Sequence, residues 1–301
     1  MKLTIYISIL LVFLCSACNT QNKNEHDLSI NAYDVLSPDL KTELPSELHE
    51  ISGLAYVDFG IVAGIQDENG IVYLIDIKTG VIKEQIQFEK KGDFEGIAII
   101  DTVFWALKSK GDLIRIEPGK EKEVFKTPLK GKNNAEGLVY DRIHNRLLIV
   151  CKGSPTHSDL DIKDVKSIYA FDIAKLKMYD DPVFKIKVVE IDSILKLSGA
   201  EKAWAKLSRS IGSNNSDLQL KPSAIAIHPI SGEYYILSAK PGMLLKLDKN
   251  GSIIGFTKLP AKLFKQPEGI CFDEDAAMII SNEGGKNGKA NLLKFNYKKE
   301  K

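Results

Sequence analysis

The sequence is poor in the residues that build most catalytic and metal centres. It holds four cysteines and five histidines in 301 residues, and no histidine lies in a metal-ligand or catalytic-triad context. The spacings H-E-x-x-H, G-x-S-x-G and that of the phosphate-binding P-loop are absent from the sequence. These absences argue against the common zinc peptidases, serine hydrolases and P-loop enzymes, and no catalytic residue is predicted.

The sequence also lacks an excess of charge of either sign. Lysine and arginine total 41 and aspartate and glutamate total 40, and no basic run with interleaved aromatic residues occurs. This balance argues against a nucleic-acid partner. Hydrophobic residues make up 44% of the chain, which is enough for a substantial core. We therefore expect a folded, monomeric protein.

One long apolar run occurs near the N-terminus, at residues 3–14, after Lys2. It is short for a membrane span and has the length of a signal-peptide core. Ser16 and Ala17 then precede Cys18, and a polar stretch follows. This pattern resembles a bacterial lipoprotein signal, although Cys15 stands where that pattern prefers leucine. The alternative is an ordinary secretory signal with incidental cysteines.

The lipoprotein interpretation divides the chain into three parts. Residues 1–17 are the signal peptide, residues 18–27 are a flexible tether, and residues 28–301 are one domain. Lipid on Cys18 would anchor the protein to a membrane, because several acyl chains hold far better than one. We therefore expect a membrane-anchored protein of the bacterial cell envelope. Cys151 and Cys271 lie in strand-like segments and are expected to be buried thiols.

The rest of the chain repeats itself. Five segments have a polar residue at their second position, then glycine or alanine, then an apolar strand: "ISGLAY", "FEGIAII", "AEGLVYD", "PSAIAI" and "PEGICF". Each is followed by further alternating segments bounded by turn residues. Four antiparallel strands recurring at about 40–45 residues are typical of a β-propeller blade. The sequence predicts an all-β propeller of four-stranded blades.

The number of blades follows from the spacing of the repeats. The equivalent positions Ser52, Glu95, Glu136, Ser223 and Glu268 are separated by 43, 41, 87 and 45 residues. The doubled step coincides with two insertions, one near residues 154–165 and a helical one around 192–212. We therefore predict five blades, with six as the alternative. The fifth repeat has three strands, and residues 28–36 are expected to supply the fourth and close the ring.

The repeated segments resemble the SdiA-regulated domain family of exported bacterial β-propellers. This family is related in architecture to the phytase-like and the gluconolactonase/regucalcin-like propellers. The resemblance covers roughly residues 45–297 and rests on the repeated Glu-Gly pairs. It implies a divalent cation, calcium above all, near the propeller axis, and it does not imply a reaction.

The five equivalent residues are the candidate site. The first strand of each propeller blade lines the central channel, so Ser52, Glu95, Glu136, Ser223 and Glu268 should form a ring, called here the axial ring. Carboxylates that converge raise one another's pKa or require a cation. Calcium suits such oxygen ligands, and zinc does not, because no histidine or cysteine cluster accompanies them. Two alternatives stay open: a purely structural ring, and a polar ring that binds an anion or a sugar.

A second set of candidates lies at the ends of the second strands. They are Asp67, Glu68, Lys108, Lys152, Lys240, Asn282 and Glu283. Loops on one face of a rigid propeller commonly bind ligands, and lysines beside acids could hold an anionic group next to a cation. The simpler interpretation is an ordinary solvated loop surface.

Two hypotheses about function follow. The first is a binding or interaction module, with calcium on the axis and a small ligand or an envelope protein as partner. The second is a metal-dependent hydrolase of the esterase, lactonase or phosphoesterase type, in which the cation would polarise the substrate or activate water.

The predicted lipid anchor is testable with one substitution. Cys18→Ala removes the thiol that would carry the lipid, and we expect the variant to leave the membrane fraction and become soluble. Fractionation of cells that express either form measures this. Cys15→Ala is the matched control and should stay with the membranes; retention of Cys18→Ala there would refute the anchor.

Overall fold

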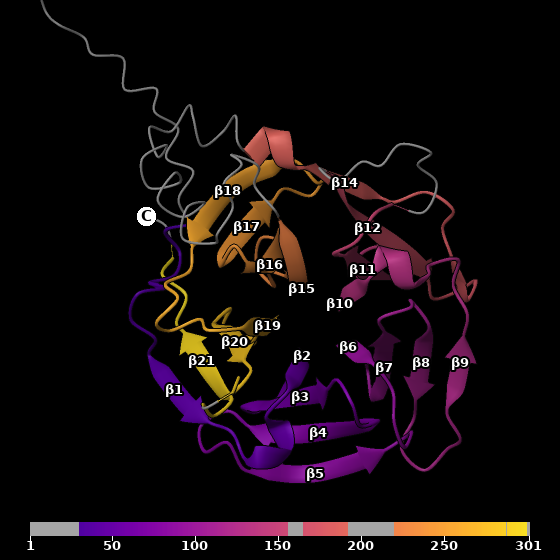
Figure 1. Cartoon of the computed structure of the whole chain (residues 1–301), viewed down its shortest axis with the longest axis horizontal. Helices are drawn as coiled ribbons and strands as arrows, with labels where there is room; N and C mark the ends of the chain where they lie inside the picture. The colour runs from indigo at the N-terminus through magenta and orange to yellow at the C-terminus, as the bar shows by residue number, and fades with distance from the viewer. Residues whose placement is uncertain (1–29, 156–164, 192–219, 287, 300–301) are drawn as a thin grey trace, which may run out of the picture.

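The computed structural model describes residues 30–155, 165–191, 220–286 and 288–299. Five antiparallel sheets stand around a central axis like the blades of a propeller, as Figure 1 shows. Six blades are thereby excluded, and the predicted five are confirmed. Residues 192–212, expected to form a helical insertion, lie outside the described residues; a short helical turn at 188–191 precedes them in the chain.

In each blade the first strand lies nearest the axis. Blade 1 comprises β2 (Ile51–Asp58), β3 (Ile61–Gln66), β4 (Ile71–Asp76) and β5 (Ile82–Gln87). Blade 2 comprises β6 (Phe94–Ile100), β7 (Val103–Lys108), β8 (Leu113–Ile116) and β9 (Glu123–Phe125). Blade 3 comprises β10 (Ala135–Asp141), β11 (Arg146–Cys151) and β12 (Val165–Asp172), whose outer edge pairs with both β13 (Lys177–Met178) and β14 (Phe184–Lys187).

Blade 4 comprises β15 (Lys221–Ile227), β16 (Tyr234–Lys240), β17 (Met243–Leu247) and β18 (Ile253–Lys258). Blade 5 comprises β19 (Pro267–Phe272), β20 (Met278–Asn282), β21 (Asn291–Phe295) and β1 (Leu40–Glu43). Short 3-10 turns at Ser46–Leu48 and Gly131–Asn133 precede β2 and β10.

The ring closes by pairing an N-terminal strand with the C-terminal one, as predicted, but the predicted segment is wrong. β1 pairs antiparallel with β21, from Leu40 opposite Lys294 to Glu43 opposite Asn291. Residues 30–36 form turns instead and pack between blades 4 and 5 through buried Ile30, Tyr33 and Val35. Their apolar residues are used as a wedge, which the alternating pattern alone does not distinguish from a strand.

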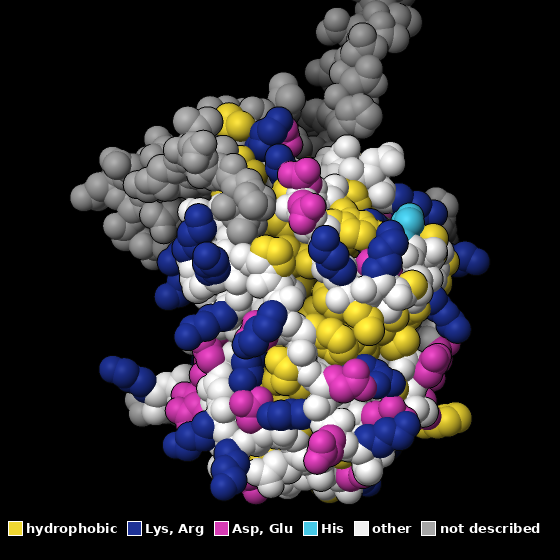
Figure 2. Space-filling model, turned by 90° about the vertical axis from the view of Figure 1, so that its right-hand side faces the viewer, with side chains coloured by type: hydrophobic (Ala, Val, Ile, Leu, Met, Phe, Trp, Pro, Cys, Tyr) yellow, Lys and Arg dark blue, Asp and Glu magenta, His cyan; other side chains and the backbone are white. Residues whose placement is uncertain are grey.

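The hydrophobic core is divided into five parts, one between each pair of neighbouring blades. For example, Trp105 of blade 2 packs with Phe171 of blade 3, and Tyr73 of blade 1 belongs to one cluster with Ile279 of blade 5. Cys151 and Cys271 are free, buried thiols within these clusters, as predicted. Figure 2 shows the perimeter on the side of blades 2 and 3, where hydrophobic side chains reach the surface between charged ones.

Glycines allow the five inner strands to approach one another. A Cβ atom on Gly137 of β10 would lie 2.7 Å from the Cα of Ala224 in β15, and one on Gly96 of β6 would lie 2.8 Å from the backbone nitrogen of Leu138 in β10. Gly53 and Gly269 meet the next inner strand at 3.0 Å in the same way. These contacts are the physical reason for the small residue in each repeat.

Within the described residues no helix has the length and apolarity needed to span a membrane.

The close approach at Gly137 makes a specific prediction about stability. Gly137→Ala places a methyl group against the backbone of blade 4, so the inner strands must separate, and we expect a loss of about 1–3 kcal/mol of unfolding free energy. Urea denaturation measures it. Gly131→Ala is the control, since its added Cβ meets nothing within 4 Å; equal losses in the two variants would contradict this account.

Candidate functional site: an acidic mouth at one end of the channel

Every residue of the axial ring sits at a β-bulge. In each blade the pairing of the first and second strands slips by one residue at the ring position, for instance between Phe94 and Gly96 around Glu95, and between Pro267 and Gly269 around Glu268. The same slip brackets the other three members, Ser52, Glu136 and Ser223. A bulge takes one residue out of the ladder and re-aims its side chain. The five predicted positions are therefore structurally equivalent.

The two serines of the ring join neighbouring blades. The hydroxyl of Ser52 donates to the carbonyl of Phe94 in blade 2 at 2.6 Å, and that of Ser223 donates to the carbonyl of Pro267 in blade 5 at 2.8 Å. Both side chains are buried. The hydroxyl hydrogens of these serines form hydrogen bonds between neighbouring blades. At these two positions the ring therefore has the purely structural role that was one of the alternatives.

The glutamates behave differently because their longer side chains meet other charged groups. Glu136 is 3% exposed, and its Oε1 accepts hydrogen bonds from Lys152 Nζ at 2.9 Å and from Asn134 Nδ2 at 2.7 Å. Burial disfavours the ammonium form of Lys152, but Glu136, Glu268 and Glu95 outweigh burial and raise its pKa. Lys152 is thus a built-in cation of the ring.

This one lysine does not neutralise the glutamates. Burial, with repulsion from Glu136 and Asp93, raises the pKa of Glu95 to about 9. Burial, with repulsion from Glu283 and Glu136, raises the pKa of Glu268 to about 8. Both carboxyl groups therefore resist ionisation at neutral pH unless further positive charge arrives.

Acids from the adjoining loops extend the negative charge toward blades 1 and 5. Burial, followed by repulsion from Asp67 and Glu50, raises the pKa of Glu283 to about 7. Burial, followed by repulsion from Glu50 and Glu68, raises the pKa of Asp67 to about 6. We call the whole set the acidic mouth; its members are Glu50, Asp67, Glu68, Asp93, Glu95, Glu136, Glu268 and Glu283.

Three buried oxygen atoms at this end of the channel have no hydrogen-bond partner in the described structure, and one of them is the hydroxyl of Ser281, which pairs with Gly269. The other two are Oδ1 of Asp67 and Oδ1 of Asn282, a residue that pairs with Pro267 beside the ring. Both are acceptors, and buried acceptors are normally satisfied. These two Oδ1 atoms therefore lack hydrogen-bond donors, in a mouth that also lacks positive charge.

The acidic mouth is not arranged as a metal centre in the described residues. No three histidine, cysteine, aspartate or glutamate side chains among them form a group that could hold a metal ion. The two ring serines are engaged with backbone carbonyls, and Glu136 holds Lys152. Calcium on the axis stays a prediction, and these five side chains do not fit it as a common set of ligands.

The second set of predicted residues is divided by the structure. Lys152, Asp67 and Glu283 belong to the mouth, and Glu68 lies exposed beside Asp67. Lys108 turns away and forms an ion pair with Glu89 at 2.9 Å, while Lys240 is exposed. Asn282 is buried and donates to Asn291. Lys108 and Lys240 thus do not join the acidic mouth, whereas Asn282 borders it through its unpartnered Oδ1.

Sequence reasoning missed Glu50, Asp93 and Asn134. Glu50 and Asp93 stand two residues before the ring positions Ser52 and Glu95, as Asn134 does before Glu136. This offset was the available signal: a polar residue stands there in all five repeats, where the loop enters the inner strand, and the other two are Lys221 and Gln266.

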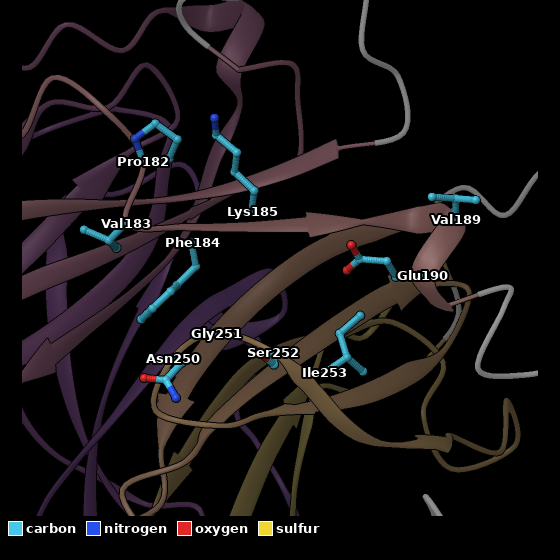
Figure 3. Close-up of a pocket in the computed structure, with 10 residues that line it drawn as sticks. All are labelled: Pro182, Val183, Phe184, Lys185, Val189, Glu190, Asn250, Gly251, Ser252 and Ile253. Atoms are coloured by element: carbon cyan, nitrogen blue, oxygen red, sulfur yellow. The ribbon is translucent and has the colours of Figure 1, made fainter.

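A separate cleft of about 660 Å³ lies at the perimeter, between β14 and the turn that joins β17 to β18. Phe184, Ile253 and Asn250 lie along it in Figure 3, with Glu190 at the side of the helical turn. It is built from outer strands and shares no residue with the acidic mouth. Residues 192–219 lie outside the described residues, and we assign the cleft no function.

The fold and the axial ring define a five-bladed β-propeller with an acidic mouth. The chain belongs to the SdiA-regulated family, which matches residues 32–285. No curated protein matches it.

Solved structures share the fold at low identity. Glutaminyl cyclase of Myxococcus xanthus is 12% identical, with a TM-score of 0.54 over 86% of this chain and 95% of that one. Virginiamycin B lyase of Staphylococcus aureus is 14% identical, with a TM-score of 0.43 over 83% and 68%. At these identities the likeness to the cyclase is one of fold alone.

The raised pKa of Glu268 predicts how stability depends on pH. The folded-state pKa of about 8 exceeds the ordinary value of 4.5, so the folded protein holds the proton on Glu268 more tightly than the unfolded chain does. The contribution of this group to the free energy of unfolding is therefore largest below pH 4.5 and is lost as pH rises through 8. Glu268→Gln removes this loss. We expect the variant to match the parent near pH 4.5 and to be about 1–3 kcal/mol more stable above pH 8.

Urea denaturation at a series of pH values measures this difference. Glu84→Gln, on the exposed outer strand β5, is the control and should leave the pH profile unchanged. A Glu268→Gln profile parallel to that of the parent would show that Glu268 is an ordinary exposed carboxylate.

Proposed function

We propose that this SdiA-regulated protein is a binding module whose acidic mouth holds a positively charged ligand. The observation that carries the proposal is the crowding of carboxyl groups from blades 1 and 5 at the end of a rigid channel. Asp67 and Glu283 repel one another, and each has a raised pKa. Lys152 lowers the pKa of Glu283 but does not offset that repulsion. A ligand cation placed between them would relieve it.

An organic ammonium or guanidinium group suits this site better than a metal ion. Lys152 is itself an ammonium group held by Glu136, so the ring already accommodates that chemistry on the side of blade 3. The opposite side offers Asp67 and Glu283 together with the unpartnered acceptors Asp67 Oδ1 and Asn282 Oδ1. An ammonium group supplies both the charge and the N–H donors that these atoms lack.

The envelope anchor is part of the same proposal. Lipid on Cys18 would hold the protein at a membrane of the bacterial cell envelope, and residues 18–27 would let the propeller move over its surface. A tethered binding module samples ligands near that surface at raised effective concentration.

An enzyme is the second candidate, and one observation favours it. The pKa values of Glu283 and Glu268, about 7 and about 8, lie at neutral pH and just above it, which suits general acid–base catalysis. A hydrolase at this site would use a carboxyl group that exchanges protons with substrate. The described side chains support no step through a metal ion, so the metal-dependent form of this hypothesis rests on the family resemblance.

Calorimetric titration with a diamine such as cadaverine tests the binding proposal. We expect saturable binding that weakens with added salt and falls about tenfold in Glu283→Gln and in Asp67→Asn, since each removes one charged partner. Glu84→Gln is the control and should bind like the parent. Absence of amine binding, together with calcium binding that Glu136→Gln abolishes, would overturn the proposal in favour of the axial calcium.

A further inference from the structure

The opposite end of the channel is apolar. A cavity of about 380 Å³ opens there, and we call it the lower funnel. All five inner strands line it, through residues 54–56, 97–99, 138–140, 225–227 and 270–272. Nearly all of these side chains are aliphatic or aromatic, and the volume lies in the range of small-ligand pockets.

The rim of the lower funnel carries unusually exposed hydrophobic side chains. Phe59 is 92% exposed, Ile143 is 76% exposed and Ile230 is 66% exposed. Each stands in the turn that joins the first and second strands of its blade, at residues 59–60, 142–145 and 228–233, next to the lining residues Tyr56, Arg142 and Pro229. Such apolar groups gathered around an opening mark a binding site rather than an ordinary solvated surface.

The polar groups of the lower funnel are few. Tyr140 donates its hydroxyl hydrogen to Asn145, and the hydroxyl of Tyr56 accepts from the backbone N–H of Gly60 and donates to the carboxylate of Glu274. Arg142 is the charged residue of the lining, and its exposed guanidinium makes no ion pair or hydrogen bond with any described residue. An apolar wall with one unpaired cation at its edge complements a molecule with an apolar body and an anionic head.

We infer that the lower funnel binds a small anionic amphiphile, such as a medium-chain carboxylate, with its chain on the axis and its head on Arg142. The inference is independent of the acidic mouth. The two ends of the channel have opposite chemistry: the mouth presents carboxylates, and the funnel presents aliphatic side chains and a guanidinium. The glycine-lined inner strands pack closely between them, so the two sites are separate.

The acidic residues of the neighbouring turns limit the size of the anionic group that can approach the rim. Asp58, Asp101 and Glu274 are exposed near the same rim, so a broad anionic surface would be repelled there. A single small head placed at Arg142 avoids them. This favours one amphiphile in the funnel over a membrane of anionic lipid.

Octanoate and 1-octanol, titrated calorimetrically into the purified protein, form a matched pair of probes. They share the eight-carbon chain and differ in the head. We expect octanoate to bind about tenfold more tightly, because a charge-assisted hydrogen bond to Arg142 adds to burial of the chain. Arg142→Gln should reduce octanoate binding to the level of octanol and leave octanol binding unchanged.

Three further variants separate the possible explanations. Lys249→Gln removes a positive charge from the turn that follows β17 and should leave both affinities unchanged. Ala55→Phe fills the lower funnel and should weaken both probes several-fold, with an unchanged circular dichroism spectrum confirming that it folds. Glu268→Gln alters the acidic mouth and should not affect octanoate.

Several results would overturn the inference. They are no binding of either probe, octanoate binding that survives Arg142→Gln, and octanoate binding that survives Ala55→Phe. Adsorption to phosphatidylcholine vesicles that depends on Phe59 and Ile143, without octanoate binding, would overturn it in favour of a lipid surface.

Discussion

The close packing of five inner strands around one axis is the constraint on which the rest of the structure depends. Gly53, Gly96, Gly137 and Gly269 let each inner strand contact the backbone of the next, where a side chain would force the blades apart. Because the inner strands lie so close together, the residue at the start of each one lies near the equivalent residues of the other blades. The bulge at each of these positions then re-aims that side chain out of the ladder.

This constraint produces the unusual electrostatics of the mouth. Glutamates that would be ordinary surface groups in separate strands become partly buried neighbours, and burial and mutual repulsion raise their pKa values together. Ser52 and Ser223 occupy equivalent positions but are short enough to bond the adjacent blade directly. One repeated position thus serves two purposes, joining blades in some repeats and concentrating charge in others.

The channel also has two unlike ends because the inner strands change character along their length. The acids and Lys152 gather where the strands begin, and the aliphatic residues of the lower funnel follow toward their ends. Since the inner strands of all five blades run in the same direction along the axis, their polar ends gather at one end of the channel and their apolar ends at the other. A short amphipathic repeat thereby becomes a channel with a charged mouth and an apolar funnel.

The sequence by itself determined the fold class, the closure by the two termini and the five ring positions, and it favoured five blades over six. These follow from local repetition, because period-2 strands, turn residues and a small residue at fixed spacing are encoded within each repeat. The tertiary structure decided which N-terminal residues close the ring, since residues 30–36 and β1 are both apolar and only packing distinguishes a wedge from a strand. It also decided which loop acids join the ring, that Lys108 pairs with Glu89 while Lys152 turns inward, and that an apolar funnel lies opposite. Those outcomes depend on distances between residues far apart in the chain, which no single repeat records.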